Sequence, residues 1–401
     1  MAGLVTGESI VNSDKMFMNN GITLITQRVE SVDVSDKKLR LSDGRELYYN
    51  KLILGVGARP FVPPIEGSKL EGVFTLRSLD DAEKIRRFLD EKRPRKVAFI
   101  GAGFISLELA ALLMEYQSGK YDISIIELLG HPLPLMLDPE LGAKLQEYLA
   151  DKCLDMRMGE KVTKILGQNG RVSGVELASG ESIEADMVFM NVGTRPNLEL
   201  ARDMGLELGG FGIKVNQFLE TSNPDVLAAG DCIENHHFVT KRQASIQLRG
   251  PAVIQGRLAA KRLAGYEIPF PGVLGNSVVR LFDKYIAATG LTEEQARQEN
   301  FEPVCATVDS RSKHGMIPGK KPWTIKLVFD KKSKKLIGGQ IISDDAVPAK
   351  VIDTINALIL GEKTIPDLTT LMCAGNPDCS SEPSSEPIAI AAEQALQKLG
   401  R

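Results

Sequence analysis

Cysteine, histidine and tryptophan are scarce in this chain of 401 residues, which holds five cysteines, four histidines and one tryptophan. An odd number of cysteines, scattered over so long a chain, excludes a disulfide framework and favours a reducing, cytoplasmic setting. The histidines do not have the spacing of zinc ligands, so that we expect no metal site.

Long apolar runs and an excess of one charge are also missing. No run reaches the roughly 18 apolar residues of a membrane span, and the opening stretch MAGLVTGESIVNSD lacks the features of a secretion signal. A net charge of −3 offers little attraction to nucleic acid or to an anionic membrane. With 43% hydrophobic residues, however, the chain can form two or three domains with cores of their own.

The chain's single glycine fingerprint for a dinucleotide lies in KVAFIGAGFISLELAALL, which begins at Lys96. An apolar strand leads into Gly-x-Gly-x-x-Ser, and an Ala/Leu-rich helix follows. We expect Gly101 to permit the tight turn, Gly103 to let a pyrophosphate approach the backbone, and Ser106 to allow close helix–strand packing. The alternative is a packing turn that binds nothing.

A second strand, YDISIIE, ends at Glu127, 26 residues after Gly101. The usual spacing is about 20 residues, and we expect the segment EYQSGKYD to supply the excess as a longer loop. A carboxylate at this position accepts hydrogen bonds from ribose hydroxyls. Because Leu128 and Leu129 follow, with no arginine to meet a 2′-phosphate, the sequence favours NADH over NADPH.

Two stretches end alike, LILGVGARP at 52–60 and VFMNVGTRP at 188–196, and each follows strands joined by tight-turn dipeptides. We interpret them as two copies of one unit. The opening stretch 11–25 of the first copy matches the helix and strand expected at 141–159 in the second. Gly101 lies 92 residues before Gly193, whereas 56 residues precede Gly57. We therefore expect the first unit to lack the part that would carry its own fingerprint.

Asp231 follows the apolar strand VLAAG, at the edge of an α/β sheet where ligands bind. By itself this pattern is also typical of an aspartate that caps a turn. Beyond the Pro/Gly-rich linker GYEIPFPG, the segments WTIKLVFDKKSKKLIGGQIIS and AVPAKVIDTINALIL predict antiparallel strands and an amphipathic helix.

The order of LILGVGARP, VAFIGAGFISLE, VFMNVGTRPN, TSNPDVLAAGDC and GPAVIQGRLAAKRLAG resembles the FAD-dependent pyridine nucleotide–disulfide oxidoreductases. The branch it resembles most contains NADH oxidases, coenzyme A disulfide reductases, persulfide reductases and rubredoxin reductases. The resemblance implies an α/β fold with two Rossmann-like, three-layer nucleotide-binding domains, the first interrupted and N-terminally incomplete, and a C-terminal α+β interface domain. The expected boundaries are 1–92 and 206–270 for the FAD-binding domain, 93–205 for the NAD-binding domain and 271–401 for the dimerisation domain.

The resemblance also implies roles for single residues. Gly230 and Asp231 match the flavin ribityl site, Gly57 and Arg59 match a flavin-side turn, and the helix from Gly250 points its N-terminus at the flavin. The residues expected to bind NAD are Gly101, Gly103, Phe104, Ser106, Glu108, Glu127 and Gly193, with Phe104 gating the nicotinamide pocket.

The chain departs from the family in two places. The FAD fingerprint and the redox cysteine that usually follows it are not in this sequence, so that it is shorter than a full protein, completed by a second polypeptide, or degenerate. Near the C-terminus some members carry a catalytic His-x-x-x-x-Glu, where this chain has Glu382, Pro383 and Ser384. Cys373 and Cys379 are instead candidates for a redox or thiol-exchange pair facing the partner's flavin, or else ordinary loop thiols.

The other cysteines and histidines have simpler interpretations. We expect Cys232 to pack beside the flavin as a small residue, Cys153 and Cys305 to be structural, and His236 and His237 to be solvated. The basic stretch at 310–323 is either a solvated loop or a site for a coenzyme A phosphate, and its candidate ligands are Arg311, Lys313, Lys320 and Lys321.

These observations together predict an NADH-dependent flavoprotein oxidoreductase. Hydride would pass from NADH to FAD and on to a disulfide, a persulfide, oxygen or a small redox protein. We expect a homodimer with no nucleic-acid or membrane partner. The alternative is an NADH-binding sensor or assembly subunit that lacks its own flavin and needs a partner.

Overall fold

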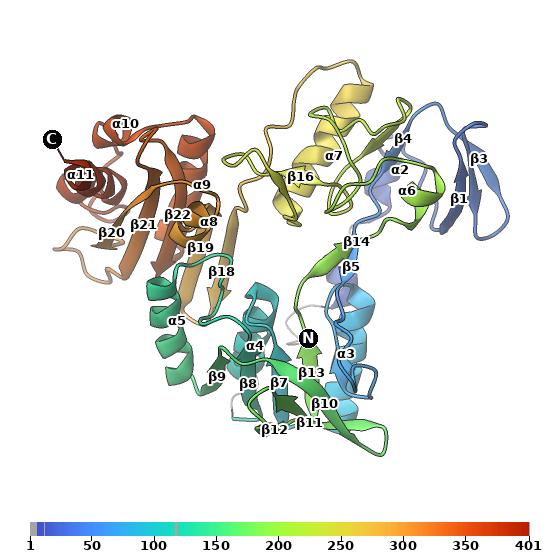
Figure 1. The fold of residues 1–401 in the computed structure, drawn as a ribbon, viewed down its shortest axis with the longest axis horizontal. Helices are drawn as coiled ribbons and strands as arrows, with labels where there is room; N and C mark the ends of the chain where they lie inside the picture. Colours follow the sequence, from blue (N-terminus) through green and yellow to red (C-terminus); the bar gives the residue numbers. More distant parts are fainter. Residues whose placement is uncertain (1–5, 12, 117–118, 401) are drawn as a thin grey trace.

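The computed structural model describes residues 6–11, 13–116 and 119–400. It contains two nucleotide-binding units and a C-terminal module, which lie at the upper right, lower centre and left of Figure 1. Each of the three has a hydrophobic core, and the core of the second unit continues into the C-terminal module through residues such as Leu281 and Ile286. None of the helices that the structure describes is long and apolar enough to cross a membrane.

The second unit is built on a parallel sheet of five strands in the order β6-β13-β7-β8-β9. Its strands are β6 (Val73–Phe74), β7 (Lys96–Ile100), β8 (Asp122–Glu127), β9 (Leu154–Met158) and β13 (Met187–Met190). Its helices are α3 (Leu79–Lys92), α4 (Phe104–Tyr116) and α5 (Pro139–Asp151), and an antiparallel sheet adds β10 (Val162–Gln168), β11 (Arg171–Leu177) and β12 (Ser182–Glu184). The central strands are continuous apolar runs because helices and sheet cover both faces.

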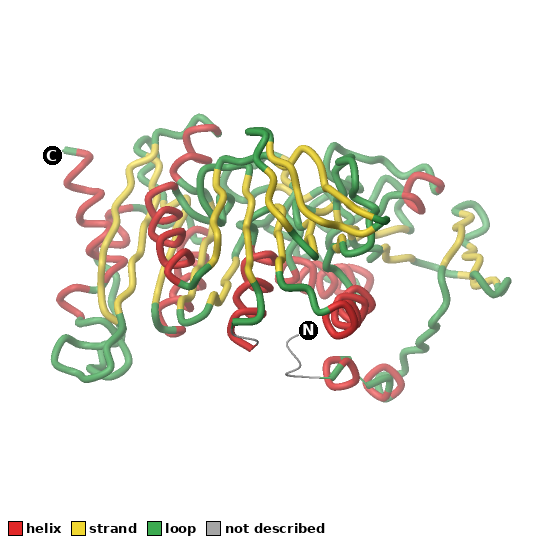
Figure 2. The backbone as a smooth tube through the Cα atoms, turned by 90° about the horizontal axis from the view of Figure 1, so that it is seen from below, coloured by secondary structure: helices red, strands yellow, loops and turns green. Residues whose placement is uncertain are grey.

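The first unit is smaller and is split in the sequence. β4 (Leu52–Leu54) and β15 (Val226–Ala228) form a parallel pair, so the chain returns to this unit after building the second. The remaining elements are α2 (Lys15–Met18), β1 (Val29–Asp33), β2 (Lys38–Leu41), β3 (Glu46–Tyr48), α6 (Glu199–Asp203), β16 (Asn235–His236), β17 (Gln243–Ala244) and α7 (Arg249–Leu263). The first helix, α1 (Gly7–Ile10), lies beside Leu79 and Glu83 of α3. Figure 2 shows the two short N-terminal helices at the margin of the molecule, joined to the β1–β3 sheet by an extended segment.

The two Gly-x-Arg-Pro stretches lie against each other. β5 (Ala58–Pro60) and β14 (Thr194–Pro196) pair antiparallel, with Arg59 opposite Arg195. The hydrogen bonds at the two ends are reciprocal, because the Phe61 amide donates to the Gly193 carbonyl (2.9 Å) and the Asn197 amide to the Gly57 carbonyl (3.0 Å). The chain thus crosses between the units along a two-stranded ribbon.

The chain passes from one unit to the other at β5 and β14, which is earlier than the domain boundaries at 92 and 205 expected from the sequence. β6 and α3 pack on the second unit, where Ile85, Phe88 and Leu89 of α3 enter its core. Ala201 of α6 and Met204 beyond it enter the core of the first unit instead. Residues 73–92 therefore belong to the second unit, and residues 199–205 belong to the first.

The C-terminal module is the expected α+β domain. Its antiparallel sheet has the order β18-β19-β22-β21-β20. The strands are β18 (Ser277–Leu281), β19 (Lys284–Gly290), β20 (Pro303–Arg311), β21 (Pro322–Asp330) and β22 (Leu336–Ser343). The helices are α8 (Glu293–Gln298), α9 (Ala346–Leu360), α10 (Ile365–Thr369), η1 (Pro383–Ser385) and α11 (Pro387–Leu399).

Candidate functional site

A cavity of about 1710 Å³ lies where the two nucleotide-binding units and the C-terminal module meet. This is larger than the roughly 300–1,000 Å³ of a usual ligand pocket, so that it has room for more than one bound group. Eight residues predicted from the sequence line it: Gly57, Gly101, Gly103, Phe104, Glu127, Gly193, Gly230 and Asp231. The tertiary structure therefore brings together residues from both units and from both segments of the first.

The fingerprint turn has the geometry expected of a pyrophosphate site. Gly101 has a φ of +96°, and a Cβ atom there would lie 2.9 Å from the Asn191 carbonyl oxygen. A Cβ at Gly103 would meet nothing within 4 Å, so the backbone is open to a ligand at the start of α4. Ser106 is fully buried, and its hydroxyl accepts a hydrogen bond from the side-chain Nδ2 of Asn191 (3.3 Å), which fits a packing role.

Glu127 holds the turn as well as facing the cavity. Its carboxylate accepts hydrogen bonds from the backbone amides of Ala102 (2.7 Å) and Leu129 (2.9 Å), and the residue is 9% exposed. Because each carboxylate oxygen has two lone pairs, both oxygens can still accept a bond from a ribose hydroxyl. The carboxylate thus joins the fingerprint turn to the loop that follows β8.

Asp231 is paired with an arginine that sequence reasoning missed. The Arg77 Nη2 atom lies 2.6 Å from Asp231 Oδ2, and both residues line the cavity. Arg77 directly precedes the N-cap of α3, Ser78, and no local pattern distinguishes it from any other residue before a helix. The pairing spans 154 positions of sequence, which explains why it could not be anticipated.

The N-terminus of α7 lies beside Asp231. Gln247 donates from Nε2 to the Asp231 carbonyl (3.1 Å) and is hydrogen-bonded to Thr194 in the ribbon. Leu248 caps α7 without a side-chain bond, so the first amides of this helix stay available to an anionic group. Gly250 lines a smaller neighbouring cavity of about 220 Å³, together with Phe104.

His237 is not solvated, contrary to the sequence expectation. It is 7% exposed and lines the cavity, and its Nδ1 atom accepts the amide of Val239 at 3.2 Å. Burial, reinforced by the charges of Lys241 and His236, lowers the pKa of His237 to about 4. The imidazole is therefore neutral near pH 7, with its proton on Nε2.

Several predicted residues lie outside the cavity lining. Arg59 is exposed and forms an ion pair with Glu199 of α6. Glu108 is half-buried in α4, and burial raises the pKa of its carboxyl. Cys232 is fully buried, its thiol lies 3.3 Å from the Ala229 carbonyl oxygen, and burial raises its pKa, so that it is a packing residue rather than a nucleophile.

Two family models match the chain: pyridine nucleotide-disulphide oxidoreductase over residues 7–256, and the dimerisation domain of the same family over 277–386. The chain belongs to this family. The oxidoreductase is 34% identical over 383 residues to an NADH oxidase of Methanocaldococcus jannaschii, which covers 94% of the chain and 84% of the relative. The resemblance drawn from the motifs is thereby confirmed.

Two solved structures extend the comparison. A NAD-dependent persulfide reductase from A. fulgidus superposes with a TM-score of 0.92 at 30% identity, covering 99% of this chain and 74% of that one. A FAD-dependent pyridine nucleotide-disulphide oxidoreductase from Desulfovibrio vulgaris gives a TM-score of 0.80 at 29% identity, with 94% and 91% coverage. The oxidoreductase therefore has the predicted α/β fold, and its family uses FAD and NADH.

The residues that line the cavity have the chemistry that the flavin half of FAD and NADH require. Asp231, Gly230 and the open N-terminus of α7 suit the ribityl chain and the ring, while Gly101, Gly103 and Glu127 suit NADH. In the sequence, the fingerprint beginning at Lys96 is the single turn of its kind. Within the part of the chain that the structure describes, no second turn of this kind offers a pyrophosphate cradle for the other half of FAD.

Cys373 and Cys379 are free, exposed thiols in the loop between α10 and η1 and do not line the cavity. This loop packs on the β20–β21 hairpin, where the His314 amide donates to the Pro377 carbonyl (3.0 Å) and Lys313 pairs with Asp378 (2.6 Å). The four basic residues proposed for a coenzyme A phosphate lie on this same stretch. A role for either group stays a prediction.

Proposed function

We propose that this oxidoreductase passes hydride from NADH through FAD to an acceptor that is a disulfide, a persulfide, oxygen or a small redox protein. The observation that carries the proposal is the single cavity in which the fingerprint turn, Glu127 and Asp231 meet. A nucleotide on the turn at Gly101 and Gly103 would reach the cavity centre beside Phe104. Bound FAD supplies the hydride acceptor, and the chain supplies the placement.

Different residues of the chain would position NADH and the flavin. The amides at Gly103 and at the start of α4 bind the NADH pyrophosphate, and Glu127 accepts the ribose hydroxyls. Asp231, held by Arg77, accepts from the ribityl chain, and the α7 N-terminus faces the ring with its positive dipole end. His237 is neutral and hydrogen-bonded, so that it neither adds nor removes charge near pH 7.

The test is whether the purified chain is yellow, or becomes so when FAD is added, and oxidises NADH with one of these acceptors. Flavin absorbance that NADH bleaches in the absence of oxygen supports the proposal. Glutathione disulfide, a persulfide, oxygen and a rubredoxin are then compared as acceptors. A colourless chain that binds NADH and takes up no FAD would contradict it for this chain.

A chain that binds NADH but no FAD is also supported by observations. Among the described residues, β4 has β15 as its one strand neighbour, and the chain holds one glycine fingerprint. A flavin-free NADH-binding subunit that needs a partner is therefore the second candidate. NADH binding without FAD uptake, measured by calorimetry, favours it.

We also propose a homodimer, because the dimerisation-domain model covers 277–386. Cys373 and Cys379 would then face the partner's cavity as a thiol pair. Replacing either by serine is expected to reduce turnover with disulfide acceptors at least about tenfold, with oxygen-dependent turnover as the internal control. Sedimentation analysis checks the dimer, and unchanged turnover with disulfides would leave both as structural thiols.

A further inference from the structure

Asp138 is a buried carboxylate at the junction of the second unit and the C-terminal module. It is 1% exposed and directly precedes α5, yet its side chain makes no capping bond in that helix. It instead accepts the backbone amides of Glu293 (3.1 Å) and Glu294 (3.2 Å) at the start of α8. Gln340 of β22 donates to it (2.5 Å) and accepts its backbone amide (2.7 Å). The residue is thus bonded to two elements of the other module.

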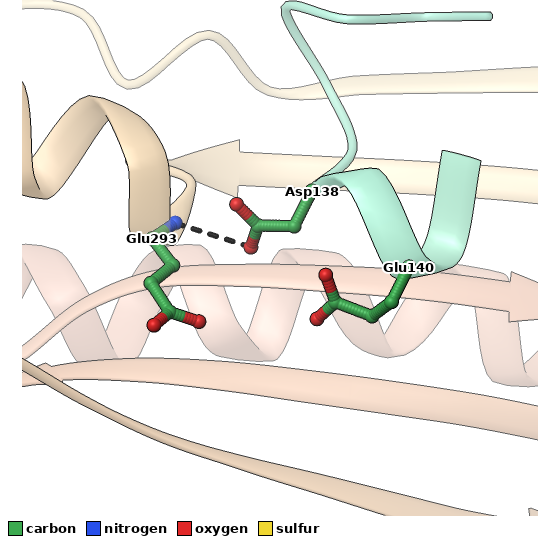
Figure 3. A group of neighbouring side chains, drawn as sticks. All are labelled: Asp138, Glu140 and Glu293. Carbon is green, nitrogen blue, oxygen red and sulfur yellow. Dashed lines mark hydrogen bonds between the residues drawn. The ribbon is translucent and has the colours of Figure 1, made fainter. Parts of the chain in front are cut away.

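Lys326 of β21 forms ion pairs with all three carboxylates of the acidic cluster around Asp138. Figure 3 shows Asp138, Glu140 and Glu293 pointing toward one another from α5 and α8. The Lys326 Nζ atom lies 2.9 Å from Asp138, 2.8 Å from Glu293 and in contact with Glu140, and the side chain is 2% exposed. An ammonium group thus occupies the space that a cation would need, so the cluster is an ion-pair network between the two bodies.

The segment that ends at Asp138 forms one wall of the cavity. Residues 128–137 connect Glu127 to Asp138, and those that line the cavity are Leu128, Leu129, Leu133, Pro134, Leu135 and Met136. The Leu133 amide donates to the Ala102 carbonyl in the fingerprint turn (3.0 Å). Gln295 of α8 donates to the Leu135 carbonyl (3.4 Å). The wall is therefore held at the turn, at its middle and, through Asp138, at its end.

The facing wall comes from the C-terminal module. Leu291, Thr292, Gln295 and Gln340 line the same cavity. Gln340 binds Asp138 directly, and the other three flank Glu293 and Glu294, whose amides Asp138 accepts. A displacement of Asp138 would therefore move the segment 128–137 relative to the wall that the C-terminal module provides. Because nucleotide affinity depends on a preformed pocket, such a displacement weakens binding without touching the reacting atoms.

We propose that Asp138 is a positioning residue for NADH, which with Lys326 holds the segment 128–137 against the C-terminal module so that the cavity fits the nucleotide. The inference rests on the proposed binding of NADH at Gly101 and Glu127. Asp138 touches neither NADH nor flavin in this scheme, and it acts through the backbone of the segment that it ends.

The test measures the NADH dissociation constant of the purified chain, with NADH fluorescence as the readout, for wild type and three variants. Asp138→Asn removes the charge but keeps the size, and we expect about a tenfold weaker NADH affinity. Glu293→Gln loosens the hold on Lys326 and leaves Asp138 in place, with about a threefold effect. Lys144→Ala is the matched control, because Lys144 of α5 also spans the two bodies, 3.9 Å from Asp309, but is exposed.

Turnover separates positioning from stability. We expect the variants to raise KM for NADH while kcat changes less than about twofold, and melting temperatures are recorded alongside. An Asp138→Asn chain with a lower melting temperature but wild-type NADH affinity would overturn the inference. If Asp138→Asn does not fold, unchanged affinity in Glu293→Gln overturns it instead. Failure of the wild-type chain to bind NADH would overturn the proposed function, which is a separate result.

Discussion

The two nucleotide-binding units end in the same motif but surround it differently. In the second unit β13 lies between β6 and β7, and all four of its residues are buried. In the first unit the equivalent strand, β4, pairs with β15 along one edge among the described residues. Its central Ile53 is 38% exposed and lines the cavity, whereas the matching Phe189 in β13 is fully buried. The difference teaches that an apolar strand is buried by its neighbours and not by its own composition.

The same contrast holds for the helix and strand that match in the two copies. In the second unit α5 has 13 residues, and β9 pairs with β8. The matching stretch of the first unit has the four-residue α2, followed by an extended segment that joins no sheet. Ile22 and Leu24 in this segment are 52% and 44% exposed. Without a strand beside it, the pattern does not form a strand.

The largest effect is expected from core truncation. Leu145 in α5 is 1% exposed, so that Leu145→Ala should lower the free energy of unfolding by about 2–5 kcal/mol. Leu24→Ala, in the matching part of the first unit, should change it by less than about 0.5 kcal/mol. Urea unfolding followed by circular dichroism measures both. Equal losses would mean that the two segments are equally packed in solution.

Lowering the pH should reduce the free energy of unfolding, because His237 is protonated more easily in the unfolded chain. Because the folded pKa is about 4 and the ordinary value is 6.5, the unfolded chain binds more protons between these pH values. Stability is therefore complete above about pH 6.5 and falls by up to about 3 kcal/mol as the pH drops to about 4. His237→Asn keeps an acceptor for the Val239 amide but cannot titrate, so its unfolding midpoint should vary less over this range. A pH profile identical to wild type would exclude His237 as the cause.

Replacing Gly101 or Gly57 by alanine should affect the binding of one nucleotide cofactor and not of the other. Gly101→Ala places a Cβ against the Asn191 carbonyl at a φ of +96° and should weaken NADH binding at least about tenfold. Gly57→Ala puts a side chain at a φ of +65°, a conformation that strains the flavin-side turn, so it should lower FAD uptake and leave NADH affinity unchanged. Calorimetry with each nucleotide measures this. Loss of both affinities in both variants would show that the units do not act separately.

The smallest effect concerns the choice of nucleotide. Leu128 is 61% exposed beside Glu127, and Leu128→Arg should raise NADPH affinity up to about fivefold through an exposed contact with the 2′-phosphate. NADH affinity should change little. The ratio of the two dissociation constants, with Leu129→Ala as control, measures the shift. An unchanged ratio would place the ribose elsewhere than at Glu127.

The fingerprint could be predicted because its signals are local. A buried strand, glycines at the positions that require them, and a helix start lie within a dozen residues, and Glu127 ends the next strand as expected. The placement of Arg77 and of His237 could not be predicted, because each depends on contacts with residues far away in the sequence. Arg59 and Gly250 belong to motifs that can be recognised in the sequence. Arg59 nevertheless lies outside the cavity lining, and Gly250 lines the smaller neighbouring cavity.

The sequence by itself determined which local pieces can form: one dinucleotide turn, two matching strand–loop units and an α+β module. Hydrophobic period, turn glycines and strand runs act over a few residues, so they can be read without the fold. Only the tertiary structure decided which pieces meet. The ion pairs of Asp231 with Arg77 and of Asp138 with Lys326 exist only after separate segments pack together. Long-range packing, not local propensity, therefore makes the shared cavity.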